Sequence, residues 1–219
     1  MNKISNRPKY TLKHPTIQLI LAVGLFIMTV LASRGADMAS WEINVFNLIY
    51  EWPRFLRPFF FAITQLGSIY MLTLLLLIYF LRKRINVMLR LFLTGTAAYL
   101  AAGVAKDLWG RVRPHEFLEN IAALDYVVRG PGFPSGHTAM AAAIGLTVAY
   151  HMPKKRRPIV LTLVFLVGLS RIYLGVHAPL DIVGGFAIGW AVYAAFRHVR
   201  LYDITLARQQ TKGQKNRRK

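Results

Sequence analysis

Residues 170–181 read SRIYLGVHAPLD, a polar stretch between two apolar segments. His177 and Asp181 are four residues apart, so on a helix that begins near Pro179 they share one face. A carboxylate one turn from an imidazole fixes its tautomer and stabilises its cation, which suits a nucleophilic or general-base histidine. Arg171 ends the preceding apolar segment and offers a fork of donors that matches phosphate oxygens. The alternative interpretation is a membrane-surface Arg171, a helix-capping Asp181 and an incidental His177.

Two further stretches favour the chemical interpretation. Residues 106–114 read KDLWGRVRP and residues 134–137 read PSGH. With 170–181 they give K-x6-R-P, P-S-G-H and S-R-x5-H-x3-D, in that order. This set resembles the three-part motif of the type 2 phosphatidic acid phosphatase superfamily, which also includes bacterial lipid pyrophosphatases and vanadium haloperoxidases. All eleven specified positions match.

The resemblance implies a role for each catalytic residue. His177 would attack phosphorus to give a phosphohistidine, Asp181 would orient His177, and His137 would protonate the leaving group before water releases phosphate. A phosphoryl group in transfer also needs its charge neutralised. We expect the phosphate to be held by Lys106, Arg113, Ser135, Gly136, Ser170 and Arg171.

No cofactor and no metal requirement is expected. Near the motifs the only carboxylates are Asp107 and Asp181, too few for a metal cage. The chain has no cysteine, which excludes disulfides and thiol chemistry.

Composition indicates an integral membrane protein. The 219 residues are 55% hydrophobic and carry a net charge of +19. Such a charge on a soluble domain would suggest nucleic acid, but here the basic residues alternate with long apolar segments, so we expect a bilayer and no nucleic-acid partner. We predict a basic cytoplasmic tail over 1–15, one phosphatase domain over 16–199, and a basic, disordered cytoplasmic tail over 200–219.

The predicted fold is all-α, a polytopic membrane protein with six transmembrane helices. The spans are expected at 16–33, 59–81, 85–109, 134–152, 159–174 and 180–196. The first apolar stretch is also compatible with a cleaved signal peptide, although its length favours an uncleaved anchor. Gly185 and Gly189 predict a helix-packing face.

Two connecting segments have open interpretations. Apolar residues recur at helical spacing over 41–52, with Glu42, Asn44 and Asn47 between them, which predicts a short interfacial helix; a plain loop is the alternative. Residues 115–133 suit either a headgroup-selecting lid or a simple linker.

Charge distribution predicts the orientation. With the N-terminus in the cytoplasm and six spans, the inner face carries 20 of the 28 Lys and Arg residues and one of the nine acids. This asymmetry fits the positive-inside rule and puts all three motifs on the outer side. We therefore expect a bacterial inner (plasma) membrane protein with cytoplasmic termini and an outward-facing site.

The expected activity is hydrolysis of a membrane lipid phosphate. Undecaprenyl diphosphate, phosphatidylglycerol phosphate, phosphatidate and a lipid A phosphate are the candidate substrates suggested by the family. A phosphotransferase that passes the phosphate to a second lipid is the alternative. A vanadium haloperoxidase is disfavoured because we do not expect one to carry six spans.

The orientation is testable by labelling, since the chain contains no native cysteine. On intact cells, an impermeant thiol reagent should label Ala122→Cys but not Lys155→Cys. Permeabilised cells, in which both should react, are the control. Labelling of position 155 and not of 122 on intact cells would refute the orientation.

Overall fold

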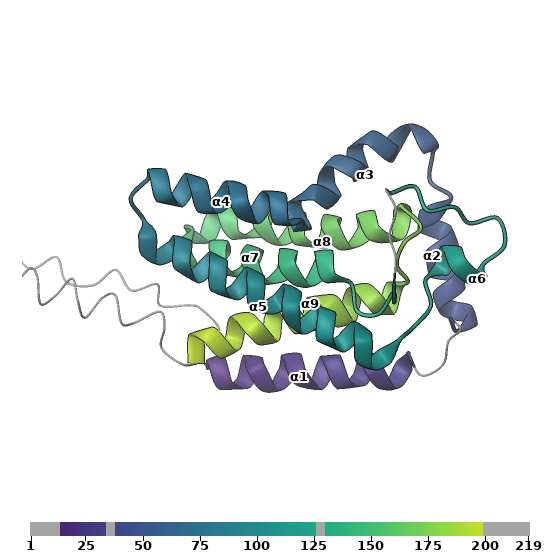
Figure 1. Cartoon of the computed structure of the whole chain (residues 1–219), viewed down its shortest axis with the longest axis horizontal. Coiled ribbons are helices and arrows are strands. Elements are labelled where there is room, and N and C mark those ends of the chain that lie inside the picture. Colours follow the sequence, from purple (N-terminus) through teal and green to yellow (C-terminus); the bar gives the residue numbers. More distant parts are fainter. Residues whose placement is uncertain (1–13, 34–37, 126–129, 199–219) are drawn as a thin grey trace, which may run out of the picture.

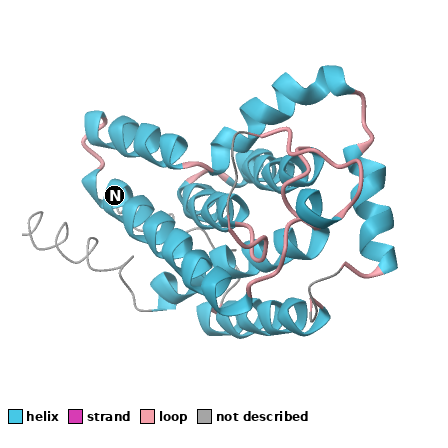
Figure 2. Cartoon of the chain, turned by 45° about the vertical axis from the view of Figure 1, so that its right-hand side comes forward, coloured by secondary structure: helices cyan, strands magenta, loops and turns pink. Residues whose placement is uncertain are grey.

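The computed structural model describes residues 14–33, 38–125 and 130–198. Helices and connecting loops account for all of them, and no strand occurs among the described residues (Figure 2). The predicted all-helical class is therefore confirmed. Most of the predicted N-terminal tail, and all of the C-terminal one, lie outside these residues.

The long helices run side by side as a bundle (Figure 1). Helix α7 lies within it and packs against α5, α8 and α9, while α1 packs against α9 and α4 against α5. Figure 1 also shows α2 lying across one end of the bundle, beside α6. The helices are α1 (Pro15–Ala32), α2 (Ser40–Tyr50), α3 (Arg57–Thr64), α4 (Ile69–Leu81), α5 (Ile85–Trp109), α6 (Pro114–Phe117), α7 (Gly136–His151), α8 (Arg157–Tyr173) and α9 (Pro179–His198).

Several helices are long and apolar enough to cross a membrane. Among the described residues three segments qualify: Pro15–Ala32, Ile85–Phe117 and Pro179–Arg197. A fourth is added if the bent pair formed by Arg54–Gly67 and Ile69–Leu81 counts as one span. Helices α7 and α8 have 16 and 17 residues, below the roughly 20 that a bilayer core requires. The chain is a multi-pass membrane protein, and six spans remain a prediction.

The predicted continuous span over 59–81 is wrong in its geometry. Helix α3 ends at Thr64, and the chain bends by 59° before α4 begins at Ile69. Ser68 is extended, and a Cβ at Gly67 would lie 2.5 Å from the carbonyl oxygen of His137. The bend thus lets the backbone at Gly67 approach the start of α7 closely.

The predicted helix over 41–52 forms as α2, so the loop alternative is wrong. Its buried face carries the aromatic residues Phe46 and Tyr50 together with the carboxylate of Glu42. Trp41 and Leu48 are exposed instead, 53% and 69% respectively. An exposed apolar face is typical of a helix at a membrane interface, and the buried carboxylate faces the bundle.

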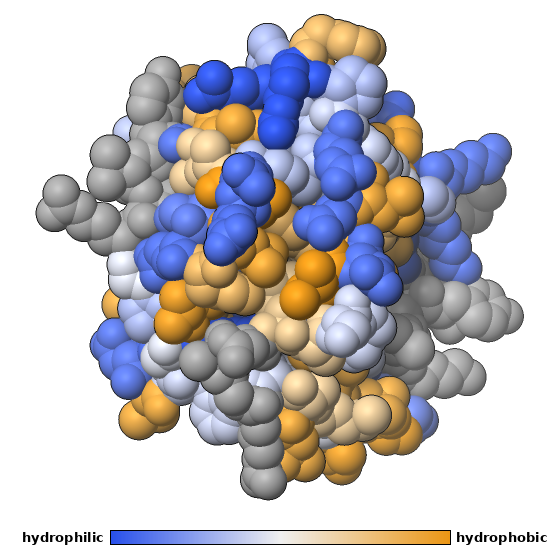
Figure 3. All heavy atoms as spheres, turned by 90° about the vertical axis from the view of Figure 1, so that its right-hand side faces the viewer, coloured by the Kyte–Doolittle hydropathy of each residue, from blue (hydrophilic) through white to orange (hydrophobic). Residues whose placement is uncertain are grey.

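The three motifs lie at one end of the bundle. The C-terminal ends of α5 and α8 and the N-terminal ends of α7 and α9 meet there, together with α2 and α6 (Figure 1). Viewed end-on, this surface mixes hydrophilic and hydrophobic residues (Figure 3). Such a mixture is typical of the boundary between lipid and water.

Close packing of α9 on α7 depends on glycine. A Cβ at Gly185 would lie 2.4 Å from the carbonyl oxygen of Ser135, and one at Gly189 would lie 2.3 Å from that of Ala139. The predicted packing face is therefore confirmed. Gly24 of α1, by contrast, has nothing within 4 Å of its Cβ position.

This contrast gives a stability prediction. Gly24→Ala and Gly189→Ala gain the same helix propensity, about 1 kcal/mol. Only Gly189→Ala overpacks an interface, at a cost of about 1–3 kcal/mol. The midpoint of thermal unfolding in detergent should fall for Gly189→Ala and stay level or rise for Gly24→Ala. Equal midpoints for the two variants would contradict the packing.

Candidate active site

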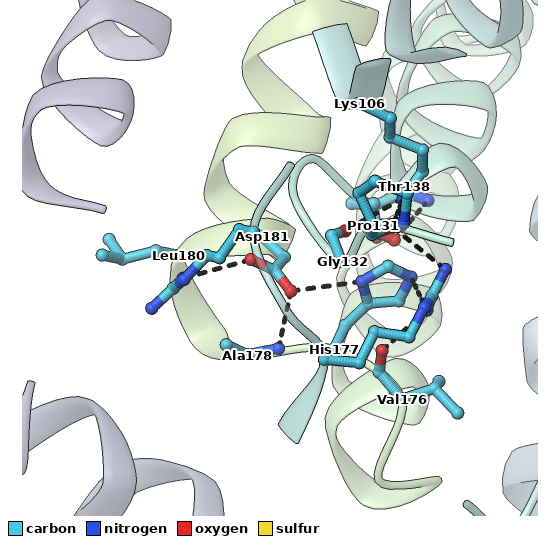
Figure 4. A network of polar contacts seen from close by, with 12 residues as sticks. Lys106, Pro131, Gly132, Thr138, Val176, His177, Ala178, Leu180 and Asp181 are labelled. Atoms are coloured by element: carbon cyan, nitrogen blue, oxygen red, sulfur yellow. Dashed lines mark hydrogen bonds and ion pairs between the residues drawn. The ribbon is translucent and has the colours of Figure 1, made fainter. Parts of the chain in front are cut away.

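His177 lies in the loop between α8 and α9, and its ring contacts Asp181 in the first turn of α9 (Figure 4). Nδ1 of His177 is 3.2 Å from Oδ2 of Asp181, and the Ala178 backbone N–H donates to the same oxygen at 2.9 Å. A carboxylate beside Nδ1 favours the tautomer with its hydrogen there, which leaves the Nε2 lone pair available. The predicted pairing of the two residues is confirmed, although only Asp181 lies on the helix.

Arg113 faces the other side of the His177 ring. Its Nη1 is 3.3 Å from Nε2 of His177 and donates to the Val176 carbonyl oxygen at 2.8 Å. Its other N–H groups donate to the carbonyl oxygens of Gly130 and Pro131, at 2.8 and 3.2 Å. The guanidinium therefore lies beside the nitrogen that would attack phosphorus.

Lys106, on α5, reaches the loop before α7 that Arg113 also contacts (Figure 4). Its Nζ donates to the carbonyl oxygens of Pro131 and Gly132, at 2.6 and 3.0 Å. Lys106 and Arg113 do not lie on one continuous helix, because α5 ends at Trp109. Gly110 follows in a left-handed conformation, with φ of 63°, and the turned chain still brings both cations together.

Arg171 is buried in the last turn of α8, with 1% of its surface exposed. Its Nη1 donates to Oγ1 of Thr64 at 2.9 Å and to Oδ2 of Asp125 at 2.5 Å. Its Nε has no hydrogen-bond partner in the described part of the chain. A buried guanidinium with donors available is well suited to an anionic group.

A cavity of about 700 Å³ joins these groups. Two exposed aromatic residues also line it, Tyr70 of α4 and Tyr99 of α5, so the cavity reaches the outer surface of the bundle. The predicted site residues that line it are Lys106, Arg113, Gly136, His137, Arg171 and His177.

Two predicted phosphate-binding residues lie apart from this cavity. Ser135 is the N-cap of α7, where its Oγ accepts from Thr138 Oγ1 at 3.0 Å and its backbone N–H donates to the Asp181 carbonyl oxygen at 2.9 Å. Ser170 Oγ donates to the Val167 carbonyl oxygen at 2.6 Å. Both serines are fully buried, and their contacts shape the helix ends that carry the site.

Burial, followed by the nearby cations Lys106, Arg113 and Arg171, lowers the pKa of the His177 imidazole well below its ordinary value. The imidazole is therefore neutral at neutral pH. A neutral imidazole keeps the lone pair that a nucleophile needs.

Three charged residues of this region were missed by the sequence reasoning. Asp125 pairs with Arg171, and Glu42 and Arg111 form a buried ion pair with each other. Arg111 lies within the first motif stretch but at an unspecified position, and Glu42 lies 69 residues before Arg111. A single Glu on a helix that is predicted to lie at the membrane interface carries no sequence signal that its side chain is buried.

The described residues contain no group of three or more His, Cys, Asp or Glu side chains placed to hold a metal ion. Independence from metal remains a prediction.

Comparison with known proteins agrees with this geometry. The family model of the PAP2 superfamily matches residues 87–204, which include all three motifs. The chain belongs to the PAP2 superfamily. The resemblance found in the sequence is thereby confirmed.

The PAP2 relatives include lipid phosphatases. Phosphatidylglycerophosphatase B of Bacillus subtilis (strain 168) is 34% identical over 147 residues, covering 60% of this chain and 69% of the relative. Undecaprenyl-diphosphatase of Sulfolobus acidocaldarius is 26% identical over 175 residues, covering 78% and 82%.

Two solved structures have a similar fold. The crystal structure of Aquifex aeolicus LpxE superposes with a TM-score of 0.65 at 30% identity, covering 73% of this chain and 95% of that one. The transmembrane PAP2-type phosphatidylglycerolphosphate phosphatase of Bacillus subtilis gives 0.71 at 26% identity, covering 83% and 95%. The chain is a membrane phosphatase of the PAP2 family.

The geometry around Arg171 predicts the effect of a conservative change. Arg171→Lys keeps the positive charge but loses the planar fork of donors. Phosphatase activity should fall about 10²–10³-fold, the usual cost of removing one preorganised donor to a developing oxyanion. Arg82→Lys is the control, because this exposed arginine caps the C-terminus of α4, which lies at the opposite end of the bundle (Figure 1). Full activity in Arg171→Lys would remove this residue from the site.

Proposed function

We propose that this protein hydrolyses the phosphate of a membrane lipid through a phosphohistidine intermediate on His177. The observation that carries the proposal is the position of the His177 ring between Asp181 at Nδ1 and Arg113 at Nε2, on the wall of a cationic cavity. That arrangement supplies a neutral nucleophile and charge neutralisation at one point.

The first step forms the phosphohistidine. Nε2 of His177 attacks phosphorus while the bond from phosphorus to the leaving oxygen breaks, and its electron pair goes to that oxygen. His137, in the first turn of α7 and on the wall of the same cavity, donates the proton that the leaving oxygen takes. Lys106, Arg113 and Arg171 neutralise the charge on the equatorial oxygens.

The second step releases inorganic phosphate. Water attacks the phosphohistidine, the P–N bond breaks, and its electron pair returns to Nε2 of His177. His137 accepts the proton that water loses, so both histidines end in their starting states. Asp181 stabilises the positively charged ring in each step.

The substrate is proposed to enter sideways from the bilayer. The cavity wall includes Ile69 and Tyr70 at the start of α4 and Tyr99 on α5, and all three are exposed on the outside of the bundle. An acyl or prenyl chain can remain in lipid beside these residues while its phosphate reaches Arg171. Undecaprenyl diphosphate, phosphatidylglycerol phosphate, phosphatidate and a lipid A phosphate all have this form.

We also propose that six helices cross a bacterial inner membrane, with both termini in the cytoplasm and the site facing outward. The short helices α7 and α8 would complete the six, since α7 is largely enclosed by α5, α8 and α9. The positive-inside distribution of Lys and Arg supports this orientation.

The leaving group separates the two histidine roles. An alkoxide leaving from phosphatidate needs a proton, whereas p-nitrophenolate, or a lipid phosphate leaving from a diphosphate, is stable as an anion. His137→Ala should therefore lower phosphatidate hydrolysis by about 10²–10⁴-fold and hydrolysis of p-nitrophenyl phosphate or undecaprenyl diphosphate by much less. His177→Ala should be inactive on all three.

His151→Ala is the control, because this histidine lies at the far end of α7. Equal losses on all three substrates would mean that His137 binds phosphate without donating a proton. A larger loss on p-nitrophenyl phosphate than on phosphatidate would contradict its role as general acid.

A further inference from the structure

A buried chain of charges lies behind the proposed nucleophile. Nη1 of Arg111 donates to Oδ1 of Asp181 at 3.1 Å, on the opposite oxygen from the one that faces His177. Nη1 and Nη2 of Arg111 also donate to the two carboxylate oxygens of Glu42, at 3.1 and 2.6 Å. The order of contacts is Glu42, Arg111, Asp181, His177.

Glu42 makes a second contact that fixes the helix carrying Asp181. The Leu180 backbone N–H, in the first turn of α9, donates to Oε1 of Glu42 at 2.9 Å. Free N–H groups at a helix start are satisfied by acceptors such as this carboxylate. One side chain of α2 therefore holds both Arg111 and the start of α9.

The burial of this chain of charges is complete. Glu42 and Asp181 have 0% of their surfaces exposed, and Arg111 has 3%. Neither Glu42 nor Arg111 lines the cavity where the phosphate would bind. Desolvating a buried ion pair costs so much that the pair on its own adds little net stability. A role in the reaction therefore accounts for the pair better than stabilisation of the fold does.

Charge balance indicates what that role is. Attack by His177 puts a positive charge on its ring, which the negative charge of Asp181 stabilises. If Arg111 were paired with Asp181 alone, the positive charge of Arg111 would cancel the negative charge of Asp181. Glu42 compensates Arg111, so that the buried group keeps a net charge of −1 beside His177.

We propose that Glu42 of α2, acting through Arg111, is a positioning residue that maintains the charge and orientation of Asp181 for the proposed reaction of His177. Glu42 lies outside residues 87–204, the part that matches the PAP2 family model. The exposed face of the same helix carries Trp41, Val45 and Leu48. The helix that presents an apolar face to the outside thus also supports the catalytic aspartate.

The test measures kcat, KM and the acid limb of the pH profile for p-nitrophenyl phosphate. Glu42→Gln keeps the side-chain shape and removes one negative charge. Its kcat should fall roughly 10- to 100-fold, the range seen for outer partners of metal-bound histidines. KM should stay unchanged, because Glu42 does not line the cavity.

The acid limb gives a readout that a purely structural role would not move. With one negative charge fewer, the protonated His177 ring is less stabilised, so the limb should move to lower pH. The double variant Glu42→Gln/Arg111→Gln restores a net charge of −1, so its limb should return to the wild-type position while kcat stays low. The groups that face His177, unchanged in both variants, are Lys106, Arg113, His137, Arg171 and Asp181.

Two further variants keep the result interpretable. Glu42→Asp retains the charge but shortens the side chain, so its limb should stay in place while kcat falls. Glu51→Gln removes an exposed carboxylate just after the same helix and should behave as wild type in every measurement. Elution from a sizing column and thermal unfolding confirm that each variant is folded; if Glu42→Gln is not, Glu42→Asp and the double variant decide.

Two outcomes would overturn the inference: an unchanged kcat and acid limb in folded Glu42→Gln, or a limb that stays displaced in the double variant. The inference rests on the proposed function, and His177→Ala separates the two. Activity in His177→Ala would refute the phosphohistidine. An inactive His177→Ala together with a wild-type Glu42→Gln would refute only the role of Glu42.

Discussion

Asp181 makes contacts to all three motif regions, and the rest of the site depends on them. Its carboxylate accepts from the Ala178 N–H and from Arg111, and it contacts the His177 ring. Its backbone carbonyl oxygen accepts from the N–H of Ser135, which caps α7. A carboxylate enclosed in this way is stable only with such partners, since a buried charge without them is very costly. The same contacts therefore hold the N-terminal ends of α7 and α9 together with the loop segment that follows α5.

Burial makes these contacts stronger than they would be in water. Electrostatic interactions weaken less in a water-poor environment than in bulk water, so under the proposed function a few cations suffice to attract a phosphate. Lys106 and Arg113 donate to backbone carbonyl oxygens, and Arg171 donates to Asp125. Under the proposed function, the substrate phosphate competes with these partners for the cations. The glycine-mediated approach of α9 to α7 keeps the two histidine-bearing ends close.

The sequence predicted the parts of this arrangement that follow from spacing and hydropathy. The pairing of His177 with Asp181, the start of α7 at Ser135, the helix α5 and the packing face at Gly185 all follow from local rules. The break after Thr64 did not, because an apolar stretch reads as one span whether or not it bends. The burial of Glu42 was not predicted for a related reason. Its partner Arg111 lies 69 residues away, and helical spacing alone does not tell which face of α2 is buried.

The central claim is that phosphate passes through His177, and trapping the phosphorylated enzyme tests it most directly. Enzyme mixed with a ³²P-labelled lipid phosphate and quenched within milliseconds should carry label that is stable to base and lost in acid. Peptide mapping should locate that label at residue 177, and His177→Ala should carry none. Label on another residue, or single turnovers that release phosphate with no labelled protein at any time point, would contradict the account.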